Sequence, residues 1–278
     1  MITLLDGPLG TQLNARGVAT NLPWWSAAAI DSAASEIETI HREYTAAGST
    51  VHTANTFRTQ QRTVGDQWER LARRAVQITL QTVDRSTHRV AGSIAPLEDC
   101  YRPDLSPGSS SRREHRELAS VLADAGCDIL LCETFAAPIE AIVAVEEAVR
   151  TGTETWIAFT AGPDGNLMTP QAIRQAAETA VQVGASAVLV NCTPAADTLR
   201  FVQAIAEAGL GVPIGAYANS GKADDLVGWQ ADNATSTGAY LSYAKSWIKA
   251  GATIVGGCCG TGPAHIAALA DGLRTTAV

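Results

Sequence analysis

The sequence predicts an α/β fold in which eight parallel strands close into a single (β/α)8 TIM barrel. The first observation is that short runs of β-branched or apolar residues alternate with longer amphipathic stretches rich in Ala, Glu and Arg. The second is that several of these stretches end in a glycine just before the next apolar run, as helices with a glycine C-cap do. Strict alternation implies parallel strands joined by right-handed crossovers, and eight such units in roughly 250 residues fit a closed barrel.

The elements follow one another regularly along the chain. Runs of apolar and β-branched residues predict strands at 2–5, 50–53, 89–93, 128–132, 156–160, 187–190, 213–216 and 253–255. Amphipathic stretches predict helices at 35–47, 66–84, 113–125, 138–151, 169–183, 195–208 and 236–250. The glycines that end helices before a strand are Gly48, Gly126, Gly184 and Gly251.

An open, doubly wound sheet is the alternative architecture, because periodicity alone does not show whether a sheet closes. The sequence has no GxGxxG segment after the first predicted strand and no Walker A segment. Those two segments bind phosphates in doubly wound nucleotide-binding proteins. Their absence favours the barrel and argues against a dinucleotide ligand.

Composition and charge indicate one large domain that spans residues 1–278, of which 46% are hydrophobic. The net charge of −8 is distributed, without a basic stripe, so we expect neither a nucleic-acid partner nor an anionic membrane surface. No run of about 18 apolar residues occurs and the first residues do not resemble a signal peptide, which predicts a cytoplasmic protein. In a reducing cytosol, its six cysteines suit metal binding or catalysis better than disulfides.

Active-site groups of a (β/α)8 barrel lie at the carboxyl ends of the strands. In the predicted barrel, polar and metal-ligating residues concentrate at these positions. They are Asp6, Asn55, Glu133, Asn191, Cys192, Tyr217, Asn219, Cys258 and Cys259.

The most informative segment is Gly256-Gly257-Cys258-Cys259-Gly260, at the end of the last predicted strand. Adjacent residues of a regular strand point to opposite faces, so an irregular, glycine-flanked backbone is needed to aim both sulfurs at one ion. Two inert thiols or a vicinal disulfide are the alternatives for this segment by itself. Cys192 ends the sixth strand, near enough around one barrel mouth to join the pair. Three cysteine ligands with an open fourth position are typical of a reactive zinc site.

Six segments together show that the chain resembles the zinc-dependent homocysteine S-methyltransferases. This family includes the betaine- and S-methylmethionine-dependent enzymes and the homocysteine domain of cobalamin-dependent methionine synthase. The resemblance runs the whole length, and the last two segments are its most specific marks. The segments are Asp6-Gly7-Pro8-Leu9-Gly10-Thr11, Pro23-Trp24-Trp25-Ser26-Ala27, Ala54-Asn55-Thr56-Phe57, Glu133-Thr134-Phe135, Asn191-Cys192-Thr193-Pro194 and the terminal Gly256-Gly257-Cys258-Cys259-Gly260.

The resemblance implies that Cys192, Cys258 and Cys259 hold Zn²⁺, and that Asp6 and Glu133 bind the amino group of the thiol amino acid. It predicts methyl transfer from a sulfonium donor, S-methylmethionine or S-adenosylmethionine, to the thiolate of homocysteine, which gives methionine. Zinc is needed because a thiol with a pKa near 8.5 is mostly protonated at neutral pH and only the thiolate is a good nucleophile.

Three alternatives stay open at this point. The acceptor could be another thiol or a selenol, and the donor could be betaine-like. A non-enzymatic alternative is a module that senses zinc or oxidation through Cys258 and Cys259.

Several further residues are weaker candidates. Asn55, Tyr217 and Asn219 are expected to contact substrate. The polar loop 95–104 either lines the donor side or is a plain surface lid, and Trp24 and Trp25 either pack the barrel or stack on a donor cation.

The remaining histidines and cysteines are expected to be structural. We expect His52 in the core or at the rim and no histidine on zinc. The other four are expected on helix or loop surfaces: His41, His88, His115 and His265. Cys127 and Cys132 flank a buried strand and are expected to be small core residues.

Overall fold

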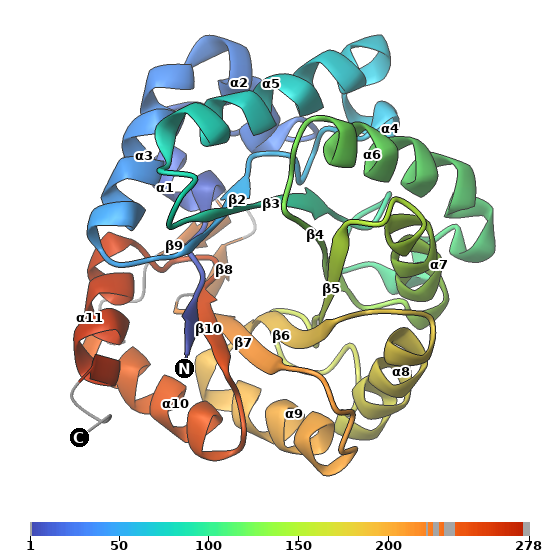
Figure 1. The fold of residues 1–278 in the computed structure, drawn as a ribbon, viewed down its shortest axis with the longest axis vertical. Coiled ribbons are helices and arrows are strands. Elements are labelled where there is room, and N and C mark those ends of the chain that lie inside the picture. Colours follow the sequence, from blue (N-terminus) through green and yellow to red (C-terminus); the bar gives the residue numbers. More distant parts are fainter. Residues whose placement is uncertain (1, 221, 225–227, 231–236, 275–278) are drawn as a thin grey trace.

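The fold is a ring of eight parallel strands surrounded by helices (Figure 1). The structure, a computed structural model, describes residues 2–220, 222–224, 228–230 and 237–274. The barrel strands are β1 (Thr3–Leu4), β2 (Val51–Ala54), β3 (Arg89–Ile94), β4 (Ile129–Phe135), β5 (Glu154–Phe159), β6 (Ala187–Pro194), β7 (Ile214–Asn219) and β10 (Ile254–Gly257). A separate antiparallel pair, β8 (Lys222–Asp224) and β9 (Gly228–Gln230), follows β7.

The strand order shows that the sheet closes. Neighbouring strands pair in parallel in the order β1-β10-β7-β6-β5-β4-β3-β2. The two ends of this series meet, because Leu5 forms a parallel bridge with Val51 and the Thr50 amide donates to the Leu4 carbonyl oxygen at 2.8 Å. The predicted (β/α)8 barrel is therefore confirmed, and the open sheet is wrong.

The seven predicted helices are present to within two residues at each end, although residue 236 of the last lies outside the described residues. They are α3 (Ala34–Ala46), α5 (Trp68–Thr82), α6 (Arg112–Asp124), α7 (Pro138–Val149), α8 (Pro170–Gln182), α9 (Ala195–Glu207) and α10 (Thr237–Lys249). The sequence did not predict α1 (Leu9–Ala15), α2 (Ala29–Ser32), α4 (Gln61–Val64), α11 (Pro263–Arg274) and the 3-10 turns η1 (Trp25–Ala28), η2 (Gly65–Gln67), η3 (Pro103–Leu105) and η4 (Gly108–Ser111). Most of these are a single turn or contain a glycine, which weakens the helical pattern.

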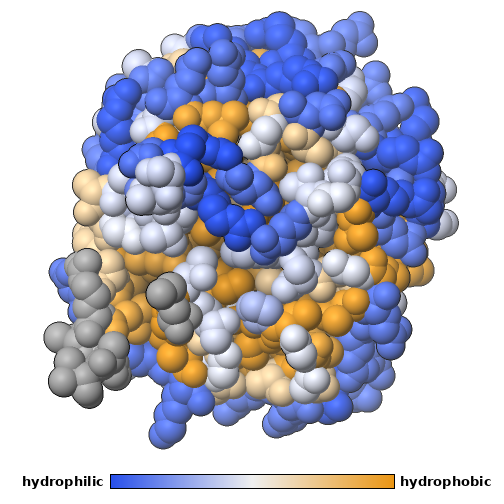
Figure 2. All heavy atoms as spheres, in the orientation of Figure 1, coloured by the Kyte–Doolittle hydropathy of each residue, from blue (hydrophilic) through white to orange (hydrophobic). Residues whose placement is uncertain are grey.

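The helices bury one face against the barrel. In α5 the buried residues recur at helical spacing, for example Leu71, Ala75 and Ile78, so this helix covers the strands with one apolar stripe. Figure 2 shows mostly hydrophilic residues along the upper edge of the face drawn, over α5 and α6, and more hydrophobic residues in its lower half.

A second set of apolar residues fills the inside of the barrel. Its members alternate along the strands, as inward-facing positions must. They include Leu5, Val51, Ala91, Ile129, Leu131, Trp156, Ala158, Ala187, Leu189 and Ile254. The barrel interior is thus a packed core, and a ligand must bind beyond the carboxyl ends of the strands.

Six strands end later than the sequence predicts, and two of these end irregularly. β4 continues to Phe135 and β6 to Pro194, and each ends in a shift of register against its neighbour. Each irregular end has a residue in the left-handed region, Thr134 with φ 66° and Cys192 with φ 46°. Non-glycine residues rarely adopt such angles, and β-bulges next to active sites are one place where they do. Glu133 and Cys192 therefore lie inside irregular strand ends and not after them.

Candidate active site

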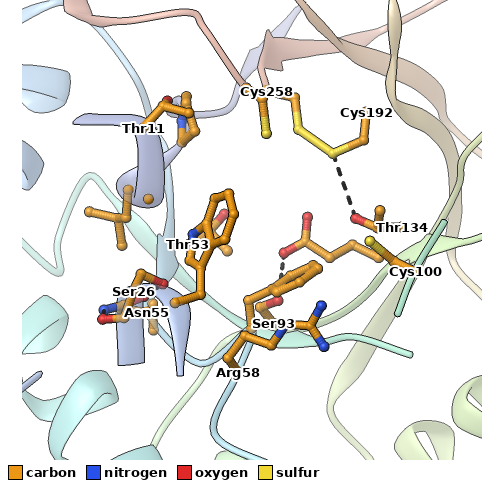
Figure 3. A pocket seen from close by; sticks show the side chains of 18 of the residues that line it. Thr11, Ser26, Thr53, Asn55, Arg58, Ser93, Cys100, Thr134, Cys192 and Cys258 are labelled. Atoms are coloured by element: carbon orange, nitrogen blue, oxygen red, sulfur yellow. Dashed lines mark hydrogen bonds between the residues drawn. A yellow bond between two sulfur atoms is a disulfide. The ribbon is translucent and has the colours of Figure 1, made fainter. Parts of the chain in front are cut away.

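Three cysteine sulfurs converge at the mouth of the barrel. The Sγ atoms of Cys192, Cys258 and Cys259 all lie within 4.8 Å of one another. Cys192 comes from the end of β6 and the other two follow β10, on the far side of β7. The structure joins Cys192 and Cys258 as a disulfide and leaves Cys259 as a free thiol (Figure 3). The vicinal disulfide considered from the sequence is therefore not the pairing that the structure has.

The glycines before the cysteine pair are required by close packing. A Cβ on Gly257 would lie 2.1 Å from Thr261 Oγ1, and a Cβ on Gly256 would lie 2.5 Å from Leu5 Cβ. Both glycines pair regularly with β7, so the expected irregular backbone does not begin there. Thr261 donates to the Cys258 carbonyl oxygen at 2.8 Å, which fixes the turn that carries the pair. Glycine here allows the strand and the turn to approach each other.

The Cys192 sulfur accepts two hydrogen bonds. Asn191 Nδ2 donates to it at 3.5 Å and Thr134 Oγ1 at 3.8 Å, the latter drawn in Figure 3. Asn191 also binds Thr134 directly, through Nδ2 to Oγ1 at 2.8 Å, so it ties the bulge of β4 to that of β6. Once Cys192 is reduced, donors directed at its sulfur favour the charged thiolate form. Strand-end position identified Asn191, but no sequence signal placed Thr134 on the sulfur.

Asp6 is one of two buried carboxylates in the site. Its Oδ2 accepts from the Thr53 amide at 2.9 Å and its Oδ1 from Thr53 Oγ1 at 3.1 Å. Burial raises the pKa of Asp6 well above its ordinary value, and the charge of Glu133 raises it further. The two carboxylates are therefore close enough to repel each other.

Glu133 is the second buried carboxylate, on β4. Its Oε1 accepts from Ser93 Oγ at 2.5 Å and its Oε2 accepts from the Tyr217 hydroxyl at 2.9 Å. Burial raises the pKa of Glu133, although these hydrogen bonds lower it in part. Neither partner carries a positive charge, so the carboxylate pair is suited to a cation from a ligand.

Two uncharged histidines lie close to Asp6, and neither balances the charge of its carboxylate. His41 and His52 are fully buried, and each has a ring nitrogen within 4.8 Å of the other's and of an Asp6 oxygen. Burial lowers the pKa of His41 to about 3 and that of His52 to about 4, so both are neutral at pH 7. The expectation that His41 and His115 lie on a surface is wrong, because both are fully buried between packed elements.

The other predicted substrate residues have different places. Asn55 exchanges hydrogen bonds with Ser26, accepting from its hydroxyl at 2.6 Å and donating to its carbonyl oxygen at 2.8 Å, and so holds η1 in place. Tyr217 positions Glu133, as described above. Asn219 is buried at the end of β7, outside the lining of the cavity described next. Cys127 and Cys132 are buried, as expected.

One cavity of about 510 Å³ is bordered by the two carboxylates, the three cysteines, Thr134, Asn55 and Tyr217. Asn191, Asn219, His41 and His52 lie outside its lining. Its walls include Trp25, Phe57 and Tyr101, and the loop 95–104 contributes five consecutive residues from Leu97 to Tyr101. Trp24 instead packs against the core. The cavity is large enough for two small substrates, of which one would lie at the cysteines.

Known proteins share this arrangement of fold and sequence. The sequence profile described as homocysteine S-methyltransferase matches residues 3–273. The chain belongs to the homocysteine S-methyltransferase family. In the described part of the chain, no helix is both long enough and apolar enough to cross a membrane.

Individual members agree with this family assignment. Homocysteine S-methyltransferase 4 of Zea mays is 32% identical, over 98% of this chain and 89% of that protein. A selenocysteine methyltransferase of Astragalus bisulcatus is 28% identical, over 94% and 89% respectively. The metallated form of the Escherichia coli homocysteine methyltransferase MmuM superposes with a TM-score of 0.78 at 26% identity, covering 96% of this chain and 95% of that one. The predicted family, and with it the predicted class of methyltransferase, is confirmed.

Proposed function

We propose that the protein is a zinc-dependent enzyme that moves a methyl group from a sulfonium donor to the thiolate of homocysteine, giving methionine. S-Methylmethionine and S-adenosylmethionine are the donors proposed. The convergence of three cysteine sulfurs beside two buried carboxylates in one cavity carries the proposal. The homocysteine-binding barrel would span residues 1–278, and its cytoplasmic location stays a prediction.

The donor set suits zinc. Three sulfurs within 4.8 Å of one another can surround one ion with Zn–S bonds of about 2.3 Å, once Cys192 and Cys258 are reduced. Three protein ligands leave the fourth position for a substrate, and thiolate ligands suit alkyl transfer better than water activation. When bound there, zinc would lower the pKa of the substrate thiol and hold it as a thiolate.

The two carboxylates suit the ammonium group of homocysteine. Asp6 and Glu133 both border the cavity near the cysteines, and the neighbouring histidines are neutral. An ammonium group between them would relieve their mutual repulsion and favour the ionised form of both. The same contact would orient the homocysteine side chain towards the cysteines.

The reaction itself needs little more than positioning. The homocysteine thiol gives its proton to solvent, and a lone pair of the thiolate forms the new bond to the methyl carbon. The bond from that carbon to the donor sulfur breaks, and its electron pair stays on the donor, which leaves as a neutral thioether. The residues of the cavity hold the two sulfurs in line with the methyl carbon, and no covalent bond to the enzyme forms.

Selenocysteine is a second acceptor to consider, because one relative is named a selenocysteine methyltransferase. A selenol is more acidic than a thiol and would use the same site. A betaine-like donor would present an ammonium methyl group in place of a sulfonium.

The test is methyl transfer by reduced, zinc-loaded protein. Homocysteine and selenocysteine would each be combined with S-methylmethionine, S-adenosylmethionine and betaine, and the methylated product would be measured by mass spectrometry. We expect methionine from homocysteine with a sulfonium donor. Product from none of the combinations, with zinc bound, would refute the proposal.

A further inference from the structure

One positive charge in the cavity has no acidic partner among the residues that the structure describes. Every other arginine side chain that the structure describes forms an ion pair with an Asp or Glu. Arg58 forms none with the described residues, yet it is half-buried and borders the cavity. A guanidinium group is always charged, and burying it without a partner costs free energy. An anionic ligand group would remove that cost.

Arg58 is nevertheless held in place. One of its N–H groups donates to the Glu98 carbonyl oxygen at 3.4 Å, and its guanidinium carbon lies 5.3 Å from the centre of the Phe57 ring. A carbonyl and an aromatic face orient the group without neutralising it. The remaining N–H groups of the planar fork are therefore available to a ligand.

The neighbouring Arg62 shows what a structural arginine looks like in this cavity. Arg62 binds Glu114 through Nε at 2.7 Å and Nη2 at 2.8 Å, and Glu98 through Nη1 at 2.6 Å. These ion pairs link α4 to α6 and to the loop 95–104. Arg58 contacts the backbone carbonyl oxygen of Glu98, whereas the Glu98 carboxylate binds Arg62.

We propose that Arg58 binds the carboxylate of the methyl donor, S-methylmethionine in the simplest case. This inference rests on the proposed function and names the group that selects its donor. A guanidinium fork matches a carboxylate in two parallel hydrogen bonds, which gives orientation as well as attraction. Phe57, Tyr101 and Trp25 line the same cavity and offer aromatic faces to the sulfonium.

The donor, and not the acceptor, is the better match for Arg58. The acceptor has the cysteines for its sulfur and the pair Asp6 and Glu133 for its ammonium group. Its carboxylate is on the same carbon as that ammonium group, so the KM for homocysteine is measured alongside that for the donor. Arg58 contacts the loop 95–104, and Figure 3 shows it across the pocket from Cys192 and Cys258. A donor anchored there would present its methyl group towards the cysteine end of the cavity.

The test compares donors with and without a carboxylate. Methyl transfer to homocysteine would be measured with S-methylmethionine and with its carboxamide, S-methylmethioninamide, for the wild type and for Arg58→Ala, Arg58→Lys and the surface control Arg174→Ala. We expect Arg58→Ala to raise the KM for S-methylmethionine about 10- to 100-fold. The KM for the carboxamide should hardly change, Arg58→Lys should restore part of the loss, and the control should behave as wild type. The KM for homocysteine and the zinc content should be the same in all.

Three results would overturn the inference. These are an equal loss with both donors, a rise in the KM for homocysteine instead of the donor, or a wild type that prefers the carboxamide. Calorimetric binding of S-methylmethionine to the zinc-loaded protein, without homocysteine, tests Arg58 apart from turnover. Absence of binding by the wild type, or equal binding by Arg58→Ala, would also refute it. Binding that depends on Arg58 without any methyl transfer would instead refute the proposed function alone.

Discussion

Replacing Glu133 by Gln removes one of the two charges that we assign to the homocysteine ammonium. Glu133 is only 8% exposed, and its two oxygens accept from Ser93 and Tyr217. Glutamine has a single acceptor oxygen, so it cannot serve both hydroxyl groups and also face an ammonium. Loss of one partner of a desolvated charged contact typically costs about 2–5 kcal/mol. Because Asp6 keeps its carboxylate, we expect the lower part of that range, about 2–3 kcal/mol.

That free energy corresponds to a rise of about 30- to 150-fold in the KM for homocysteine. The assay is initial-rate methyl transfer at saturating donor, with zinc measured on the same samples. Glu38→Gln, a change at an exposed helical ion pair with Arg42, is the matched control and should behave as wild type. Zinc content should be unchanged in both. If Glu133→Gln lost zinc and kept the wild-type KM for homocysteine, Glu133 would act on the metal and our assignment would be refuted.

Three other predictions concern the metal, the turn and acid stability. Cys259→Ala should reduce bound zinc from about one per chain to a small fraction and abolish methyl transfer. The control Cys127→Ala should retain both zinc and activity. Zinc retention by Cys259→Ala would refute the assignment of Cys259 as a zinc ligand. Gly257→Ala must displace Thr261 and should lower the free energy of unfolding by about 1–3 kcal/mol, together with zinc content, in urea titrations and metal analysis. Burial lowers the pKa of His41 from 6.5 to about 3. Between these two pH values the unfolded chain binds a proton at His41 and the folded chain does not, so the free energy of unfolding falls as the pH drops below about 6.5. Between pH 7 and 5, His41→Gln should therefore lose about 2 kcal/mol less stability than the wild type; equal losses would show that His41 does not titrate in this way.

The sequence by itself was sufficient for the order of the barrel strands and their main helices, and for naming the residues proposed to hold the metal. Strand and helix periodicities are local properties, so they could be read before any tertiary contact was known. The barrel rule then placed Asp6, Glu133 and Cys192 at one mouth, because the carboxyl ends of parallel strands share one side. Asp6, Glu133 and all three cysteines border the same cavity.

Only the tertiary structure decided how those residues are aimed and which charges are left over. The bulges at Thr134 and Cys192 depend on the register between neighbouring strands, which no local pattern encodes. The burial of His41 depends on how α3 and α5 pack together, so a pattern that favoured the surface was wrong. Arg58 is ordinary in sequence and becomes distinctive only when every other described arginine has found its acidic partner. Some of these pairs are local, such as Arg42 with Glu38, but others, such as Arg62 with Glu114 and Arg89 with Glu154, join distant parts of the chain and are known only once the chain is folded.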